Sequence, residues 1–252
     1  MGTEAYLMLK KLHRGFNLLS GYFYYTAKPK FLNPISFARY INDIRSKSII
    51  EKNHPSLFNL IESLLAESSS TGCEYSDYLN LYRRIRTGRY KCILECGSGV
   101  STAVLALASK ENFEEGKGKS SIISMEENEF YYNQIKELIP ADLQKYISFC
   151  YSKRVERKYG SHLGCHYESV PDNIYDFIYI DGPTDRKTWN DTSSPKCFNS
   201  DILNVSKSEE FEAILDQRIW TLRALRELAP NFDYKYYPEG KYARIRASKV
   251  QR

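Results

Sequence analysis

Three acidic residues stand directly after short, mainly apolar runs, a position from which a carboxylate can act on a bound ligand. They are Glu95, Glu126 and Asp181. Apolar runs of this length predict buried strands of a parallel sheet. Because the carboxyl ends of parallel strands meet at one edge of the sheet, we expect these carboxylates to line a crevice there. A carboxylate at such an edge can accept hydrogen bonds from ligand hydroxyls or take a proton from a reacting group.

A glycine-containing turn, Cys-Gly-Ser-Gly at residues 96–99, follows Glu95. The alanine- and leucine-rich stretch behind it predicts a helix that runs toward Lys110. The two glycines permit a sharp turn and a close approach to a ligand, and the helix N-terminus offers free N–H groups. Hydroxyls in the first helical turn would face the same cavity. The candidate binding residues here are Glu95, Gly97, Ser98, Gly99, Ser101 and Thr102.

The turn does not fit two common nucleotide-binding motifs. A dinucleotide fingerprint needs a further glycine or alanine where Thr102 stands, and a P-loop needs a lysine after the glycines. The remaining pattern, Glu-x-Gly-x-Gly, resembles the first motif of the class I S-adenosylmethionine-dependent methyltransferases. The resemblance implies that Glu95 lies near the methionine amino group of the cofactor, with Gly97 and Gly99 passing close beneath it. An ordinary strand–turn–helix without a ligand is the alternative.

Glu126 is the candidate ribose ligand. A carboxylate at the tip of the second strand, predicted at residues 121–125, can accept hydrogen bonds from both hydroxyls of a ribose. The usual spacing from the glycine turn is roughly twenty residues, and the charged loop at 111–120 lengthens it here. We prefer Glu126 to Glu127 because it ends the strand, whereas Glu127 and Asn128 suit the cap of the next helix.

Ser152 follows a predicted third strand, residues 146–151, and the resemblance implies that it contacts the adenine. The next segment, residues 153–169, is polar and glycine-containing, so it predicts a loop. His162 and His166 have the spacing of one helix face, but the glycines argue against a helix. We therefore do not expect a metal-binding pair, and a loop histidine near the site remains an alternative.

Asp181 opens an Asp-Gly-Pro turn after the predicted strand at 174–180. The Ile-Asp-Gly-Pro strand tip resembles that of small-molecule and sugar methyltransferases, which implies that this carboxylate faces the methyl group and the acceptor. Capping of a following helix is the alternative. The polar insertion at 184–208, anchored by Trp189 and Phe198, is the candidate lid over the acceptor.

Asp216 is the second candidate catalytic residue. Residues 211–228 fit a single helix stripe, but the fold needs a fifth strand, so we predict a strand at 213–216 and a helix at 218–228. Asp181, Asp216 and Gln217 then resemble the ligands of metal-dependent O-methyltransferases, in which a divalent cation lowers the pKa of the acceptor oxygens. Glutamine stands where that family has asparagine, and we do not favour a metal.

The chain of 252 residues is 42% hydrophobic and 27% charged, as expected of a globular protein with a real core. Its formal net charge of +5 is compatible with an anionic substrate or a membrane surface but is too small to indicate nucleic acid. The six cysteines show no metal-binding or CxxC spacing, which favours free thiols. The start of the chain has no signal-peptide pattern, and no apolar run is long enough for stable membrane insertion. We expect a cytoplasmic protein.

Residues 1–87 predict a helical extension, with helices at 6–25, 35–45, from Pro55 onward and at 75–85. The first could contact a membrane or a partner, including a second copy of the chain, but we favour packing on protein because two glycines interrupt its apolar face. Residues 232–237 and 242–247 predict a closing hairpin.

Together these features predict an α/β protein. Residues 88–252 would form the Rossmann-like sheet of a class I methyltransferase with a terminal antiparallel hairpin, behind the helical extension. The expected function is S-adenosylmethionine-dependent methyl transfer to an oxygen of a small polar or sugar-type acceptor. The alternative is a non-catalytic module of the same fold that acts through its N-terminal helices. A dehydrogenase is disfavoured by the missing glycine and by the hairpin.

Overall fold

The computed structural model describes residues 34–69, 74–186, 193 and 195–247. The predicted helix at 6–25 and Trp189 lie outside these ranges. No helix in the described part of the chain has the length and apolar character needed to span a membrane.

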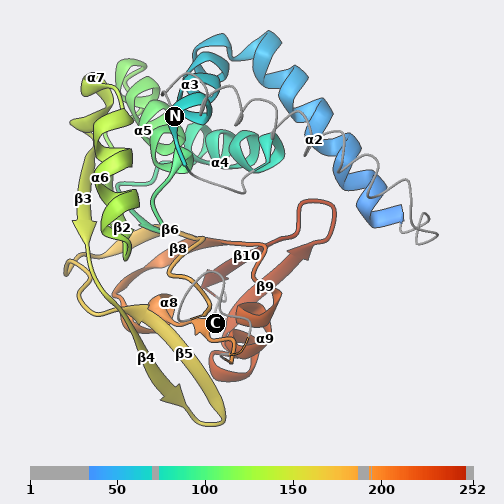
Figure 1. Ribbon diagram of the computed structural model, residues 1–252, viewed down its shortest axis with the longest axis vertical. Helices are drawn as coiled ribbons and strands as arrows, with labels where there is room; N and C mark the ends of the chain where they lie inside the picture. The colour runs from blue at the N-terminus through green and yellow to red at the C-terminus, as the bar shows by residue number, and fades with distance from the viewer. Residues whose placement is uncertain (1–33, 70–73, 187–192, 194, 248–252) are drawn as a thin grey trace, which may run out of the picture.

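The main sheet has seven strands in the order β3-β2-β1-β6-β8-β10-β9. These are β1 (Cys92–Cys96), β2 (Ser121–Glu126), β3 (Ile147–Tyr151), β6 (Tyr175–Ile180), β8 (Lys207–Asp216), β9 (Phe232–Tyr237) and β10 (Tyr242–Ala247). Strand β10 is antiparallel to both its neighbours, and the remaining pairs are parallel. The structure thus confirms the predicted fold class, a Rossmann-like sheet that ends in an antiparallel hairpin (Figure 1).

Helices cover both faces of this sheet (Figure 1). They are α2 (Pro34–Asn53), α3 (Pro55–Glu67), α4 (Tyr75–Thr87), α5 (Val100–Glu114), α6 (Glu129–Leu138), α7 (Ala141–Gln144), α8 (Asp201–Asn204) and α9 (Ile219–Leu228). One hydrophobic cluster joins α3, α4 and α5 to one face, and a second joins α8 and α9 to the other. The predicted helix at 35–45 continues to Asn53, and the predicted strand at 213–216 begins earlier, at Lys207.

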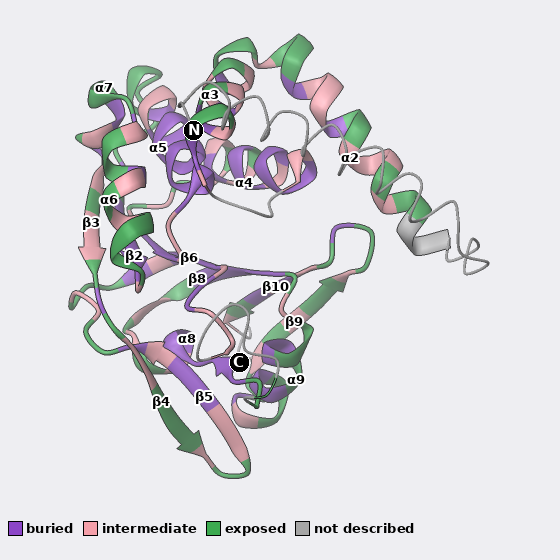
Figure 2. Ribbon diagram, viewed as in Figure 1, coloured by how far each residue is buried: buried purple, intermediate pink, exposed green. Residues whose placement is uncertain are grey.

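Helix α5, which follows the glycine turn, is the most deeply enclosed helix of the fold. Its residues from Val100 to Ser109 are all buried, because it lies between the sheet and the pair α3 and α4. Figure 2 shows this contrast with α2, most of whose residues are exposed or only partly buried. The alanine-rich sequence of α5 allows this close approach on several sides.

The segment predicted as a loop at 153–169 is instead a β-hairpin, so that expectation was wrong. Strands β4 (Arg154–Tyr159) and β5 (His162–Tyr167) pair antiparallel, and β7 (Phe198–Asn199) adds a third strand to this small sheet. Gly160, with φ +59°, makes the tight turn between them. Because most residues of β4 are polar or charged, the strand lacks the alternation of apolar and polar residues by which strands are recognised in a sequence.

Part of the insertion at 184–208 belongs to the core. Phe198 is 1% exposed, as its predicted role as an anchor requires, and its neighbours from Cys197 to Ile202 are also buried. Because β7 pairs with β5 and α8 packs on the sheet, this part of the insertion is not a surface lid.

Candidate functional site

The strand order reverses between β1 and β6, and the backbone segments after these two strands touch. The amide of Asp181 donates to the carbonyl oxygen of Cys96 at 2.9 Å, and that of Gly182 donates to the same oxygen. Gly97, with φ +98°, turns the chain away at this point. In open α/β sheets, ligands bind outside the carboxyl ends of the strands at such a reversal. The predicted glycine turn and Asp-Gly-Pro tip therefore lie together.

Glu95 is fully buried and holds the start of α5 to the sheet. Its carboxylate accepts hydrogen bonds from the hydroxyls of Ser101, Thr102 and Ser124, each at 2.6 Å. Burial raises the pKa of Glu95 to about 7, although these three hydrogen bonds act in the opposite direction. Thr102 also accepts a hydrogen bond from the amide of Gly99 at 3.0 Å. The hydroxyls of Ser101 and Thr102 thus point at Glu95.

Glu126 is the last residue of β2 and lies beside the glycine turn, where the sequence placed it. One carboxylate oxygen accepts hydrogen bonds from the amide and the hydroxyl of Ser98, both at 3.1 Å, and the other from the amide of Asn128 at 2.9 Å. The side chain is 5% exposed. Burial, followed by repulsion from Glu127, raises its pKa to about 7. These three donors leave the carboxylate one further acceptor position, because an ionised carboxylate can accept about four hydrogen bonds.

The neighbours of Glu126 have separate roles. Asn128 caps α6 by accepting from the amide of Phe130 at 2.9 Å. Glu127 is no helix cap: it accepts from the amide of Thr184 at 2.8 Å and from the hydroxyl of Tyr167 at 3.2 Å. Glu127 therefore links the end of β2 to the segment after Asp181.

Ser152 lies next to Glu126, at the end of the third strand. Its amide donates to the carbonyl oxygen of Glu126 at 3.0 Å, and its hydroxyl accepts from the amide of Ser169 at 3.0 Å. The side chain is buried. Ser152 thus lies beside Glu126 at this edge of the sheet.

Asp216 closes β8, two residues after Ile214, whose side chain belongs to the cluster with α4 and α5. Glu95 and Asp181 likewise lie two residues after Ile93 and Tyr179 of that cluster. Because residues two apart along a strand share a face, the three acids follow one face of neighbouring strands.

Burial differs among these acids. Asp216 is 3% exposed, and its Oδ1 has no hydrogen-bond partner among the described residues. Burial, together with the charges of Asp181 and Asp77, raises the pKa of Asp216. Asp181 is more open, with a side chain 38% exposed. The protein that surrounds the Asp181 carboxyl group at the strand tip still removes enough solvent to raise its pKa; Arg218 opposes this, and Glu127 adds to it.

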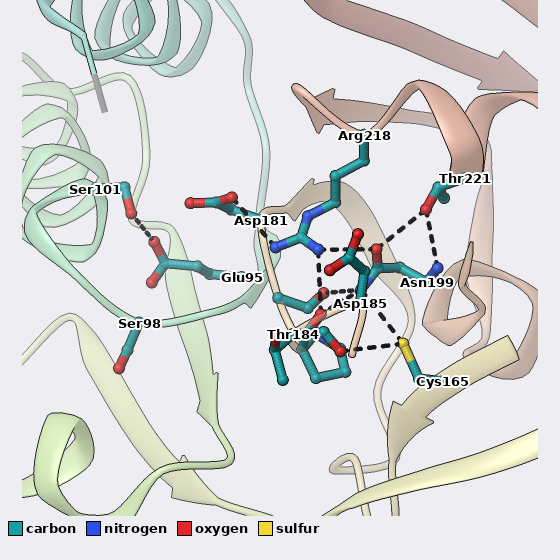
Figure 3. Close-up of polar contacts among 12 residues, drawn as sticks. Glu95, Ser98, Ser101, Cys165, Asp181, Thr184, Asp185, Asn199, Arg218 and Thr221 are labelled. Carbon is teal, nitrogen blue, oxygen red and sulfur yellow. Dashed lines mark hydrogen bonds and ion pairs between the residues drawn. The ribbon is translucent and has the colours of Figure 1, made fainter. Parts of the chain in front are cut away.

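Arg218 is one of the residues of the site that sequence reasoning missed. Its guanidinium lies 3.4 Å from Oδ1 of Asp181 and donates at 3.2 Å both to the carbonyl oxygen of Pro183 and to the side chain of Asn199 (Figure 3). Its place two residues after Asp216, at the same strand tip, was the available signal. Arg218 thus brings a positive charge to Asp181, and its charge also acts on Asp216.

Asn199 fixes the turn after Asp181 from the other side. Its amide group donates to the carbonyl oxygens of Gly182 and Pro183 at 2.8 and 2.7 Å, and its side-chain oxygen accepts from Thr221 at 3.1 Å (Figure 3). It is fully buried. Nothing in the sequence marked Asn199, because its role depends on contacts between segments far apart along the chain.

The two histidines lie outside this constellation. Nε2 of His162 lies 2.7 Å from a carboxylate oxygen of Glu227, and His166 lies 3.5 Å from the hydroxyl of Ser200. In the described ranges, no three His, Cys, Asp or Glu side chains gather as potential metal ligands. Of the three residues that resemble metal ligands, Asp181 and Asp216 supply carboxylates. The third, Gln217, follows Asp216 and has a left-handed backbone conformation, with φ +47°.

No protein-family model and no curated protein sequence matches the chain. Several solved structures resemble its fold. One is a precorrin-6y C5,15-methyltransferase from Geobacter metallireducens, at 12% identity and TM-score 0.43, over 72% of this chain and 93% of that one. A candidate methyltransferase of Escherichia coli, yhhF, has 13% identity and TM-score 0.44, over 73% and 91%. A type I restriction-modification methyltransferase subunit from Streptococcus thermophilus has 11% identity and TM-score 0.44, over 79% and 51%. At these identities and TM-scores the likeness carries no conclusion about this chain.

Proposed function

We propose that this protein is a class I S-adenosylmethionine-dependent methyltransferase that acts on a hydroxyl group of a small polar or sugar-type acceptor. The observation that carries the proposal is the row of carboxyl groups of Glu95, Asp181 and Asp216 on one sheet face, beside the reversal of strand order. The cofactor carries positive charge on both its sulfur and its amino group. A crevice lined by carboxyl groups and partly shielded from water favours such a ligand.

Two features of the residues fit this cofactor. Oδ1 of Asp216 is buried and unpartnered within the described structure, so it has a free acceptor position for a cationic or hydrogen-bonding group. Glu126 stands at the tip of β2 beside Ser98, where a carboxylate can accept from ribose hydroxyls. Ser152 lies next to Glu126, in the position proposed for the adenine.

S-adenosylmethionine would supply a methyl group already activated by the positive charge of its sulfur. The protein then has to align an acceptor, exclude water and accept a proton. Asp181 suits the last task because its carboxylate is 38% exposed, whereas Glu95 and Asp216 are buried. Arg218 would orient the Asp181 carboxylate toward the acceptor hydroxyl, and Asn199 would hold the backbone beneath it.

A second candidate function is a non-catalytic module of the same fold. It is favoured by the internal hydrogen bonds of Glu95 and Glu126, whose carboxylate oxygens are all engaged by neighbouring residues. A protein that needed no cofactor could keep these bonds permanently.

Calorimetric titration of the full chain with S-adenosylmethionine, S-adenosylhomocysteine and NAD tests the proposal. We expect saturable binding of the first two and none of NAD. Binding of NAD alone would point to a different enzyme class. If neither S-adenosylmethionine nor S-adenosylhomocysteine binds, the result would contradict the proposed enzyme and favour the non-catalytic module.

A further inference from the structure

A lysine stands just before each of three neighbouring strands. Lys91 directly precedes β1, Lys119 lies two residues before β2, and Lys145 lies two residues before β3. These strands are parallel neighbours in the order β3-β2-β1. Their first residues therefore share one edge of the sheet, opposite the edge that carries Glu95 and Asp181. In Figure 1 this is the edge next to α7.

The three lysines line an open cavity of about 250 Å³. Its other lining residues are Ser121, Tyr146, Ile147 and Ser148. The ring of Tyr146 is buried, and the ammonium groups of Lys119 and Lys145 lie 5.5 and 5.4 Å from its centroid. A fixed aromatic ring that attracts both ammonium groups keeps the two charges at the same cavity.

These positive charges have no direct ion-pair partner within the described structure. Neither Lys91, Lys119 nor Lys145 forms an ion pair with a carboxylate of the described residues. The acids nearby make their short contacts with other groups, although Asp142 also lies close enough to act on Lys145 electrostatically. Asp176 accepts from the backbone amides of Lys91 and Cys92 at 2.7 and 3.0 Å, and Asp142 pairs with Lys110 at 2.6 Å. Three like charges around one cavity repel each other, and a bound anion would relieve that repulsion.

We propose that this cavity binds the phosphoryl group of a small ligand. Lysine is a common phosphate ligand in proteins because its ammonium is a compact charge with three donors. The exposed residues Ser121 and Ser148 add hydroxyl donors to the lining. The cavity lies below the roughly 300–1,000 Å³ of drug-sized ligand sites, which suits a phosphate or pyrophosphate group. The inference is independent of the proposed methyltransferase activity, since the two sites lie at opposite sheet edges.

Titration of the full chain with inorganic pyrophosphate tests the site. The site variant carries Lys91→Gln, Lys119→Gln and Lys145→Gln. The matched control carries Lys52→Gln, Lys158→Gln and Lys235→Gln, which removes the same charge from exposed lysines elsewhere. We expect saturable binding by the parent and the control, and at least tenfold weaker binding by the site variant.

A second measurement locates the ligand. Pyrophosphate should shift the backbone amide resonances of Ser121 and Ser148 in the parent and leave them unchanged in the site variant. Because all six substituted lysines are exposed, both variants should keep the parent's melting transition. Equal affinity of the site and control variants, or no saturable binding by the parent, would overturn the proposal.

Discussion

The backbones of Gly97 and Gly182 meet so closely that neither position has room for a side chain. A Cβ on Gly182 would lie 2.6 Å from the Cα of Gly97, and a Cβ on Gly97 would lie 2.8 Å from the amide nitrogen of Gly182. This contact joins the turn after β1 to the tip of β6, and thereby sets the position of Asp181 relative to Glu95. Gly97 is thus required by contact within the protein, a reason that the motif did not reveal.

Substitution of Gly97 should test this contact. Gly97→Ala is expected to lower the free energy of unfolding by about 3 kcal/mol, from the strain of φ +98° together with the steric clash at Gly182. Gly118→Ala is the matched control, because Gly118 has φ +100° and nothing within 4 Å of a Cβ. It should cost about 1 to 2 kcal/mol from backbone strain alone. Urea unfolding measures both values, and equal losses would mean that the contact with Gly182 is unimportant.

The elements that the sequence predicted are those whose signal is local. Apolar runs marked the strands that carry Glu95, Glu126 and Asp181, and the end of the run at 121–125 placed Glu126 last in its strand. The hairpin formed by β4 and β5 was missed because apolar and polar residues do not alternate along its strands, although the two strands pair along their whole length. Hydrophobic patterning reports burial on one face, and β4 has little burial on either.

The contacts of the site required the folded chain. Arg218 and Asn199 act on residues 181–183 from segments 16 to 37 residues away in the sequence. Such partners are selected by the packing of β7 and α9 on the sheet, which no local pattern encodes. The sequence could therefore identify which strand tips carry acids, but could not show which of them already have internal partners.

The buried carboxyl group of Glu95 should make stability depend on pH. Its pKa is about 7 in the folded protein and near 4.5 when exposed, so the folded state favours the protonated form. The stabilisation from this group is present below pH 4.5 and is lost as the pH rises through 7. Relative to Glu95→Gln, which does not titrate, the parent should lose roughly 2 to 3 kcal/mol between pH 5 and pH 8. Denaturant unfolding at both values measures this, and a constant difference would contradict it.

Glu212 should be important for attaching α4 to the sheet. Its carboxylate lies 2.8 Å from Arg84 of α4 and accepts from Arg246 of β10 at 2.6 Å, and its side chain is 5% exposed. Glu212→Ala should lower the free energy of unfolding by about 3 kcal/mol, because both arginines lose their partner. Arg246→Ala is the comparison: its side chain is 45% exposed, so its loss should stay within about 1 kcal/mol. A larger loss of unfolding free energy for Arg246→Ala than for Glu212→Ala, measured by urea unfolding, would show that Arg246 is the more important residue of this ion-pair group.

Glu126 should be required for cofactor affinity. Glu126→Ala is expected to weaken S-adenosylhomocysteine binding by about 1.5 to 3 kcal/mol, since the ribose hydroxyls would lose a charged acceptor. Glu127→Ala removes a neighbouring carboxylate that instead holds Thr184 and Tyr167, so it should lower the melting temperature but change affinity less. Calorimetric titration distinguishes them. Normal affinity in the Glu126 variant with weakened binding in the Glu127 variant would assign the ribose to Glu127.

Asp181 should be needed for methyl transfer but not for cofactor binding. Its carboxylate is 38% exposed at the tip of β6 and faces Arg218, so it can orient an acceptor hydroxyl and take its proton after the cofactor has bound. Asp181→Asn keeps the shape and removes the charge. Turnover should fall by about 10² or more, while S-adenosylhomocysteine affinity and melting temperature change little.

Two further measurements separate the roles of Asp181. Treatment with EDTA should leave activity unchanged if the carboxylate acts directly, whereas loss that magnesium or manganese restores would indicate a cation held by Asp181 and Asp216. Arg218→Met should lower turnover less than Asp181→Asn, because it releases the carboxylate without removing it. Parental turnover in Asp181→Asn would place the methyl acceptor elsewhere along the crevice, and Asp216, with its unpartnered oxygen, would then be the residue to substitute.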